Sequence, residues 1–181
     1  MIIFVGLAGS GKSVQGKLLA KEMNAQYFSM GEFLRQHVDP VIKEKMVTGV
    51  LISDEEVIEV VNDELSKVRE SADKEYILDG FPRTLKQAHW LIKEVKKGRF
   101  HIRGVIYLIA DKTVIIPRLL DRKRPDDNLE TISRRMEEYN SLTLPILDYF
   151  KEAKVKVYEV DAEKDVETVH RDIMNCLELK S

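Results

Sequence analysis

The fold class is decided by one stretch near the N-terminus, Gly6-Leu7-Ala8-Gly9-Ser10-Gly11-Lys12-Ser13, which matches G-x-x-x-x-G-K-[ST]. It follows an apolar run at 2–5 and opens a segment with helical periodicity at 13–23, the context that a phosphate-binding P-loop requires. Glycines let backbone N–H groups turn toward a phosphate, and the start of a helix adds a positive potential. We therefore expect a nucleoside triphosphate to be bound here by Gly9, Ser10, Gly11, Lys12, Ser13 and Val14.

Short β-branched runs alternate with longer amphipathic segments along the whole chain. Strands are predicted at 2–5, 25–29, 76–78, 105–109 and 155–160. Helices are predicted at 13–23, 54–68, 84–97, 111–120, 128–144 and 165–179, whereas the polar region 31–49 is not expected to contribute to the core. Such alternation is typical of parallel sheets with right-handed crossovers. The sequence predicts one α/β domain over 1–181, a P-loop NTPase-type three-layer fold with a five-stranded parallel sheet and helices on both faces.

Composition excludes several classes of protein. The 181 residues include 29 Lys plus Arg and 31 Asp plus Glu, a net charge of −2, which disfavours a dedicated nucleic-acid binder. No apolar run approaches the roughly 20 residues of a membrane span. A single cysteine, Cys176, leaves no disulfide framework or four-cysteine zinc site and fits a reducing compartment. We therefore expect a cytoplasmic protein without zinc, with neither nucleic acid nor a membrane as partner.

A carboxylate ends the third predicted strand. The apolar run at 76–78 leads to Asp79 at the C-terminal edge of the sheet, where a Walker B-type group holds Mg²⁺ through water. The Ser13 hydroxyl of the P-loop is the second expected magnesium ligand. These features alone do not distinguish a GTPase, an ATPase and a kinase.

The segment that follows narrows the choice. Asp79-Gly80-Phe81-Pro82-Arg83-Thr84-Leu85-Lys86-Gln87-Ala88 closely resembles the D-G-F-P-R-[T]-x-x-Q-A signature of adenylate kinases, within the nucleoside monophosphate kinase family, and the resemblance extends over essentially the whole chain. It implies that Arg83 binds the acceptor phosphate, with Gly80 beside it, and that Gln87 reads the adenine edge. A glutamine amide suits adenine because it offers both a donor and an acceptor.

Two further segments resemble the acceptor side of this family. Ser29-Met30-Gly31-Glu32-Phe33-Leu34-Arg35 is similar to S-T-G-D-[ML]-L-R, which implies a second phosphate ligand in Arg35. Gly49-Val50-Leu51-Ile52-Ser53-Asp54 is similar to G-x-L-V-[TP]-D, whose carbonyls line the acceptor pocket, here at Ile52. Met30 replaces the family's threonine, and the acceptor-binding segment, 30–58, is shortened by more than one helical turn. AMP and CMP or UMP therefore both remain possible as acceptors.

The arginines of the second half resemble a short lid over 119–129. Arg118 and Arg122 lie four residues apart on one helical face, so both can point at one anion. The resemblance implies that both contact the ATP phosphates. Arg124-Pro125-Asp126-Asp127 is similar to the family's R-x-D-D. This implies that Arg124 stabilises charge in the transition state and that Asp126 and Asp127 position neighbouring arginines.

Helical geometry singles out one more arginine. The apolar face of the helix predicted at 128–144 is formed by Leu129, Ile132, Met136, Tyr139 and Leu142. At 100° per residue, Arg135 lies about 60° from the centre of that face and Arg134 about 160° away. The family pattern E-[T]-x-x-x-R-[LM]-x-x-Y also selects Arg135.

The residues and the resemblance together predict an Mg²⁺-dependent adenylate kinase, ATP + AMP ⇌ 2 ADP, acting as a monomer on nucleoside mono-, di- and triphosphates. The expected catalytic residues are Lys12, Arg83, Arg118, Arg122, Arg124, Arg135, Asp126 and Asp127, with Arg118 and Arg122 also binding ATP. The expected AMP-binding residues are Met30, Arg35, Ile52, Gly80, Arg83, Gln87, Arg124 and Arg135. The alternatives are a UMP/CMP kinase of the same fold and a non-catalytic adenine-nucleotide-binding protein. A switch GTPase is disfavoured because the sequence has no N-K-x-D or T-K-x-D segment.

Overall fold

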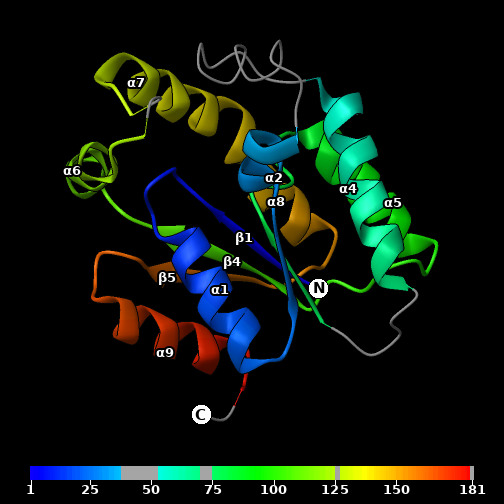
Figure 1. Ribbon diagram of the computed structural model, residues 1–181. Coiled ribbons are helices and arrows are strands. Elements are labelled where there is room, and N and C mark those ends of the chain that lie inside the picture. The colour runs from blue at the N-terminus through cyan, green and yellow to red at the C-terminus, as the bar shows by residue number, and fades with distance from the viewer. Residues whose placement is uncertain (38–52, 70–74, 125–126, 180–181) are drawn as a thin grey trace.

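The architecture is a five-stranded parallel sheet between helices (Figure 1). The computed structural model describes residues 1–37, 53–69, 75–124 and 127–179. The sheet has the order β2-β3-β1-β4-β5, formed by β1 (Ile2–Gly6), β2 (Gln26–Ser29), β3 (Tyr76–Asp79), β4 (Gly104–Ile109) and β5 (Val157–Asp161). All five predicted strands are confirmed, and their neighbours pair in parallel.

Alternate residues of β1 point to opposite faces of the sheet and into two separate cores. Ile2 and Phe4 pack with α1 (Lys12–Glu22) and α9 (Val166–Cys176). Ile3 and Val5 pack with α2 (Met30–His37), α4 (Asp54–Arg69), α5 (Leu85–Lys96) and α8 (Pro145–Glu152). Every residue of β1 is buried, as expected for a central parallel strand covered on both faces. The predicted three-layer fold is therefore confirmed.

Two helices stand beside the carboxyl end of β1. They are α6 (Lys112–Arg122) and α7 (Leu129–Glu138), at the upper left of Figure 1, near the loop that joins β1 to α1. Ile115, Leu119 and Ile132 form a small third core that also contacts Leu7 and Ala8 of the P-loop. The P-loop thus packs directly against the helices that carry the second group of arginines.

The helix predicted at 128–144 is wrong in its extent. It divides into α7, a π-helical turn η1 (Tyr139–Thr143) and α8, so the helical path continues to residue 152. Pro145 occupies the first turn of α8, where a missing N–H leaves no helical hydrogen bond unmade. The proline begins a new helix, which the periodicity alone did not indicate.

The prediction that the region 31–49 does not contribute to the core is wrong for its first part. Its first part belongs to α2, and Leu34 is buried together with Met30 at the start of that helix. These residues lie four apart and so share one face of a helix too short to show a repeating apolar pattern. Residues 38–52 lie outside the described part of the chain. None of the described helices is long and apolar enough to cross a membrane.

Candidate active site

A cleft of about 500 Å³ opens at the carboxyl ends of the strands. Parallel α/β sheets bind ligands at this edge because the loops that leave the strands converge there. The P-loop, α2, the start of α4, the β3–α5 connection, α6, α7 and η1 all contribute to its lining. Seven cationic side chains from these segments line the cleft: Lys12, Arg35, Arg83, Arg118, Arg122, Arg124 and Arg135. The predicted cations are thus brought together from positions more than 100 residues apart in the chain.

The P-loop has the backbone that phosphate binding requires. Gly9 and Gly11 have φ angles of 86° and 93°, a region that side chains other than glycine rarely adopt. No side chain caps the first turn of α1 within the described residues, and Gly11, Ser13 and Val14 of this turn line the cleft. The Lys12 ammonium donates to the carbonyl oxygens of Gly6 and Leu7, each at 2.7 Å. Lys12 is therefore folded over the loop on the side where a phosphate would bind.

The electrostatic surroundings of Lys12 suit an anion. The pKa of Lys12 is lowered to about 8, chiefly by burial; Asp79 opposes this shift, and the neighbouring Arg83 and Arg122 add to it. Each of these cations raises the free energy of the others, because their charges are alike. A bound polyphosphate would relieve that repulsion.

The two predicted magnesium residues are in direct contact. Ser13 Oγ donates to Asp79 Oδ2 at 2.6 Å, and the hydroxyl of Tyr27 donates to the same oxygen at 2.8 Å. Hydroxyl and carboxylate oxygens beside a phosphate loop fit Mg²⁺, which binds through one or two protein groups, water and substrate phosphates. Within the described residues, no group of three or more His, Cys, Asp or Glu could hold a metal by itself. Tyr27 was not predicted, because its strand position gave no sign that its hydroxyl reaches the neighbouring strand.

Gly80 and Arg83 form a tight unit after β3. Gly80 has a φ of 80°, and a Cβ there would lie 3.0 Å from Arg83 Nη2. The Arg83 side chain donates from Nε to the Gly80 carbonyl at 2.9 Å, and Thr143 of η1 donates to the Arg83 carbonyl at 3.0 Å. The peptide between Phe81 and Pro82 is cis. Arg83 is therefore held at both its side chain and its main chain at the edge of the cleft.

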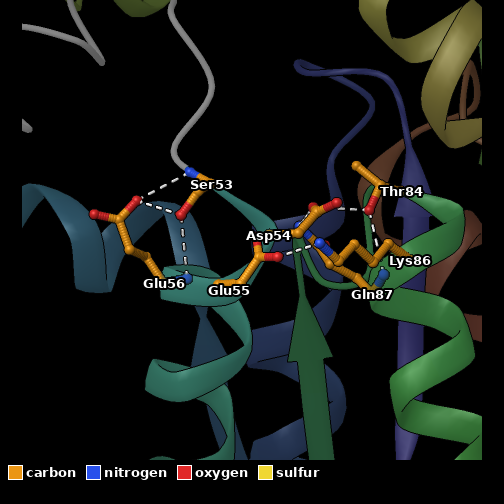
Figure 2. Close-up of polar contacts among 7 residues, drawn as sticks. All are labelled: Ser53, Asp54, Glu55, Glu56, Thr84, Lys86 and Gln87. Carbon is orange, nitrogen blue, oxygen red and sulfur yellow. Dashed lines mark hydrogen bonds and ion pairs between the residues drawn. The ribbon is translucent and has the colours of Figure 1, made fainter.

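Gln87 is buried at the cleft, with 4% of its surface exposed. Its Oε1 accepts from the Arg83 backbone N–H at 2.8 Å, and its Nε2 donates to Asp54 Oδ1 at 2.7 Å. Figure 2 shows Asp54, Thr84 and Gln87 between the first turns of α4 and α5. The residue predicted to read the base is thus fixed by two protein partners, and Asp54 is a lining residue that the sequence analysis did not single out.

The other predicted acceptor-side residues lie on or near α2. Met30, 2% exposed, and Arg35 both line the cleft. The predicted Ile52 and, on the lid, Asp126 lie outside the described residues. Val57 of α4 also lines the cleft and adds apolar surface on this side.

Asp127 contacts Arg122 and Arg124 of the predicted lid and lies near Arg135 of α7. The Arg122 guanidinium donates from Nε and Nη2 to its two oxygens at 2.9 and 2.6 Å, and the Arg124 backbone N–H donates at 3.1 Å. Arg135 Nη1 lies 3.9 Å from Asp127 Oδ1. Burial acts to raise the pKa of Asp127, but Arg122 and the Arg124 N–H outweigh it and hold the pKa below its ordinary value.

Arg118 contacts the turn after β5. Its Nη1 donates to the carbonyl of Ala162 at 2.8 Å and its Nη2 to that of Glu163 at 3.3 Å. The Glu163 carboxylate accepts in turn from the backbone N–H of Asp111, just before α6. Arg118 therefore joins α6 to the loop after the fifth strand while it lines the cleft.

The two adjacent arginines of α7 differ as helical geometry predicts. Arg135 lines the cleft, and Arg134 is not among the described residues that do so. Glu138, Tyr139, Leu142 and Thr143 complete this wall. Tyr139 and Leu142 belong to the apolar face that the periodicity predicted, whereas Glu138 and Thr143 were not predicted.

Comparison with known proteins places this cleft in a family. A family model described as adenylate kinase matches residues 4–155. An adenylate kinase of Prochlorococcus marinus (strain MIT 9301) is 36% identical over 178 residues, with 95% of each chain covered. Adenylate kinase 1 of Nostoc sp. (strain PCC 7120) is 32% identical over 186 residues, with 97% of each chain covered. With its P-loop, its converging arginines and a match over nearly its whole length, the chain belongs to the adenylate kinase family.

Proposed function

We propose that the cleft transfers the γ-phosphoryl group of ATP reversibly to AMP, giving two ADP, through the cationic residues that line it. Membership of the family makes the chain a nucleotide-binding phosphotransferase with adenylate kinase function, and the UMP/CMP kinase alternative is not favoured. One observation carries the proposal. Seven cationic side chains and only three carboxylates, Asp54, Asp79 and Glu138, line the described cleft, on a chain with a net charge of −2. Phosphoryl transfer depends mainly on such positioned charge.

The cations divide into a donor side and an acceptor side. The P-loop N–H groups and Lys12 hold the triphosphate, and Arg118 and Arg122 approach it from α6. Arg35 and Arg83 hold the acceptor phosphate from the opposite wall. Holding both substrates in line converts a reaction between two molecules into one within a single complex.

Arg124 and Arg135 complete the charge around the transferring group. Both line the cleft, and Asp127 contacts the Arg124 main chain and lies near Arg135. As charge spreads over the oxygens of the transferring phosphoryl group, guanidinium groups already in place stabilise it without having to move. No side-chain nucleophile takes part.

Mg²⁺ is the metal that the residues at the donor phosphates fit. When bound, it would offset the negative charge of the substrate phosphates. Ser13 and Asp79 would hold it, Asp79 through water, and the Tyr27 hydroxyl keeps the Asp79 carboxylate in place.

The base of the acceptor is recognised on the wall formed by α2, α4 and α5. Gln87 presents its amide at the cleft, and Met30 and Val57 supply apolar surface against which a flat base can pack. We assign the acceptor-binding segment to 30–58 and the lid to 119–129, both within one domain, 1–181. Their closure over bound nucleotides excludes water, which would otherwise hydrolyse the donor. We expect a cytoplasmic monomer.

The test is ADP formation by the purified protein with MgATP and, in turn, AMP, CMP, UMP, GMP and dAMP. We expect kcat/KM to be highest for AMP, with no more than trace hydrolysis in an ATP-only control. Preference for CMP or UMP would contradict the assigned acceptor. ATP binding without transfer to any acceptor would contradict the catalytic roles.

A further inference from the structure

We infer that Asp54 is a positioning residue that fixes the orientation of the Gln87 amide and thereby makes the acceptor site select a 6-amino over a 6-oxo purine. The inference rests on the proposed role of Gln87 in reading the acceptor base. It concerns a residue that lines the cleft but carries no positive charge for phosphate binding. Asp54 begins α4, directly opposite the start of α5 (Figure 2).

The two partners of Gln87 leave its amide only one orientation. The Asp54 carboxylate can only accept a hydrogen bond, and it receives Nε2 at 2.7 Å. The Arg83 backbone N–H can only donate, and it reaches Oε1 at 2.8 Å. A flipped amide would set oxygen against carboxylate and N–H against N–H at the same time. Because Gln87 is 4% exposed, water cannot compensate for either mismatch.

The fixed orientation of the Gln87 amide determines which bases can form hydrogen bonds with it. One N–H of Nε2 and one lone pair of Oε1 remain for a ligand in the cleft. Adenine offers an amino donor next to a ring-nitrogen acceptor, which this pair complements. Hypoxanthine has almost the same shape, but its oxygen and ring N–H reverse the order of donor and acceptor. A free amide could rotate to fit either base, whereas a fixed amide fits only the first.

Asp54 is itself held in place from α5. The hydroxyl of Thr84, the N-cap of that helix, donates to the same Asp54 oxygen at 2.8 Å. The Thr84 oxygen accepts in turn from the Gln87 backbone N–H at 3.3 Å. The carboxylate lies at the N-termini of α4 and α5, where the helix dipoles favour negative charge. The Gln87 side chain therefore contacts the Asp54 carboxylate directly, and its main chain is connected to the same carboxylate through Thr84.

The competing explanation is that Asp54 merely joins two helices. An ion pair of the adjacent residues, Glu55 on α4 and Lys86 on α5, joins the same two helices (Figure 2). Glu55 has a side chain that is 67% exposed, and within the described residues neither it nor Lys86 lines the cleft. Glu55→Ala therefore removes a link between α4 and α5 without touching Gln87. It is the matched control for Asp54→Ala.

The experiment compares kcat/KM for AMP and for inosine monophosphate, with MgATP as donor. We expect Asp54→Ala to lower the AMP-to-IMP ratio about ten-fold, the size of effect expected from one buried hydrogen bond. The change should come from a higher KM for AMP, with kcat within about three-fold of the unmodified protein. Asp54→Asn, which keeps an oxygen that can accept from Nε2, should lose less. Glu55→Ala should leave the ratio unchanged.

A double-variant cycle separates this inference from the function on which it rests. If Asp54 acts through Gln87, adding Asp54→Ala to Gln87→Ala should not lower the ratio further. The inference is overturned if Asp54→Ala leaves the ratio unchanged, if Glu55→Ala lowers it equally, or if the two losses simply add. Should Asp54→Ala not fold, an unchanged ratio in Asp54→Asn overturns it instead. If Gln87→Ala lowers the ratio and Asp54→Ala does not, the role of Gln87 stands and that of Asp54 fails; an unmodified protein without preference for AMP overturns both.

Discussion

Replacing Arg135 with alanine tests whether the cleft acts through positioned charge. Arg135 lines the cleft, beside Arg83, whereas Arg134 on the same helix does not line it within the described residues. Both side chains are half-buried, so the two alanine variants remove similar amounts of surface. Only Arg135→Ala removes a charge from the lining of the cleft.

The expected loss can be worked out from the spacing. A unit charge about 4 Å from a developing negative charge gains about 4 kcal/mol at an effective dielectric constant near 20. Removing one preorganised contact of this kind costs about 3 kcal/mol, so Arg135→Ala should lower kcat by about 10²- to 10³-fold. Stability should change little. The contact of Arg135 with Asp127 is long, at 3.9 Å, and the Asp127 carboxylate keeps its 2.6 Å ion pair with Arg122 when Arg135 is removed.

The assay is initial-rate ADP formation at saturating MgATP and AMP, together with thermal unfolding of each variant. We expect Arg134→Ala to keep kcat within about two-fold, and Tm of Arg135→Ala to fall by less than about 4 °C. Equal losses of kcat in the two variants would refute the assignment of Arg135 to the cleft. A collapse of Tm in Arg135→Ala alone would refute a catalytic origin of its effect.

Three further changes probe the metal, the lid and the acceptor turn. Ser13→Ala should raise the Mg²⁺ concentration for half-maximal activity about ten-fold, and an unchanged Mg²⁺ titration would contradict the metal assignment. The pKa of Asp127 is lowered in the folded protein, so its stabilising contribution is present above its unfolded pKa of about 3.9 and is lost as pH falls further. In urea unfolding, the stability difference between the unmodified protein and Asp127→Asn should therefore vanish in acid; a difference independent of pH would argue against the Arg122 pairing. Gly80→Ala should raise KM for AMP by crowding Arg83. Gly98→Ala is the control, because Gly98 has a φ of 71° but no atom within 4 Å of its added Cβ, so this variant has the backbone strain alone. Equal KM values for AMP in the two variants would contradict the crowding of Arg83.

The strands and the P-loop could be predicted because their signals are local. The central strands β1 and β3 are short runs buried on both faces, and the glycines at positive φ are visible in the motif itself. Two helices, α2 and α8, were not predicted as separate elements, for other reasons. The first, α2, has two turns and shows no repeat, and α8 begins with Pro145 after a π-helical turn. Neither a short helix nor an inserted residue leaves a periodic pattern.

The site residues were found or missed for a related reason. Motif positions such as Lys12 and Gln87 can be recognised by their neighbours in the chain. Tyr27 and Asp54 act on groups that are distant in sequence, on Asp79 of the next strand and on Gln87 of another helix. Such contacts depend on strand order and on how two helices meet, which one sequence does not reveal. The sequence thus indicated the residues assigned to phosphate and base and, through the family pattern, Asp127 beside the arginines of the lid, but not Tyr27 or Asp54.

The excess of positive charge in the cleft also bears on the order of events. Lys12 already has a pKa lowered to about 8, in part because Arg83 and Arg122 are near. Moving the Arg122 end of the lid closer to Lys12 without an anion between them would raise the electrostatic energy further, because water that screens the charges would be expelled. Bound phosphates place negative charge between Lys12 and Arg122, so the electrostatic energy would then fall as the lid closes. We therefore expect closure of the proposed lid to follow the binding of anions, and a donor together with an acceptor to favour closure more than the donor alone, because each added phosphate strengthens the attraction.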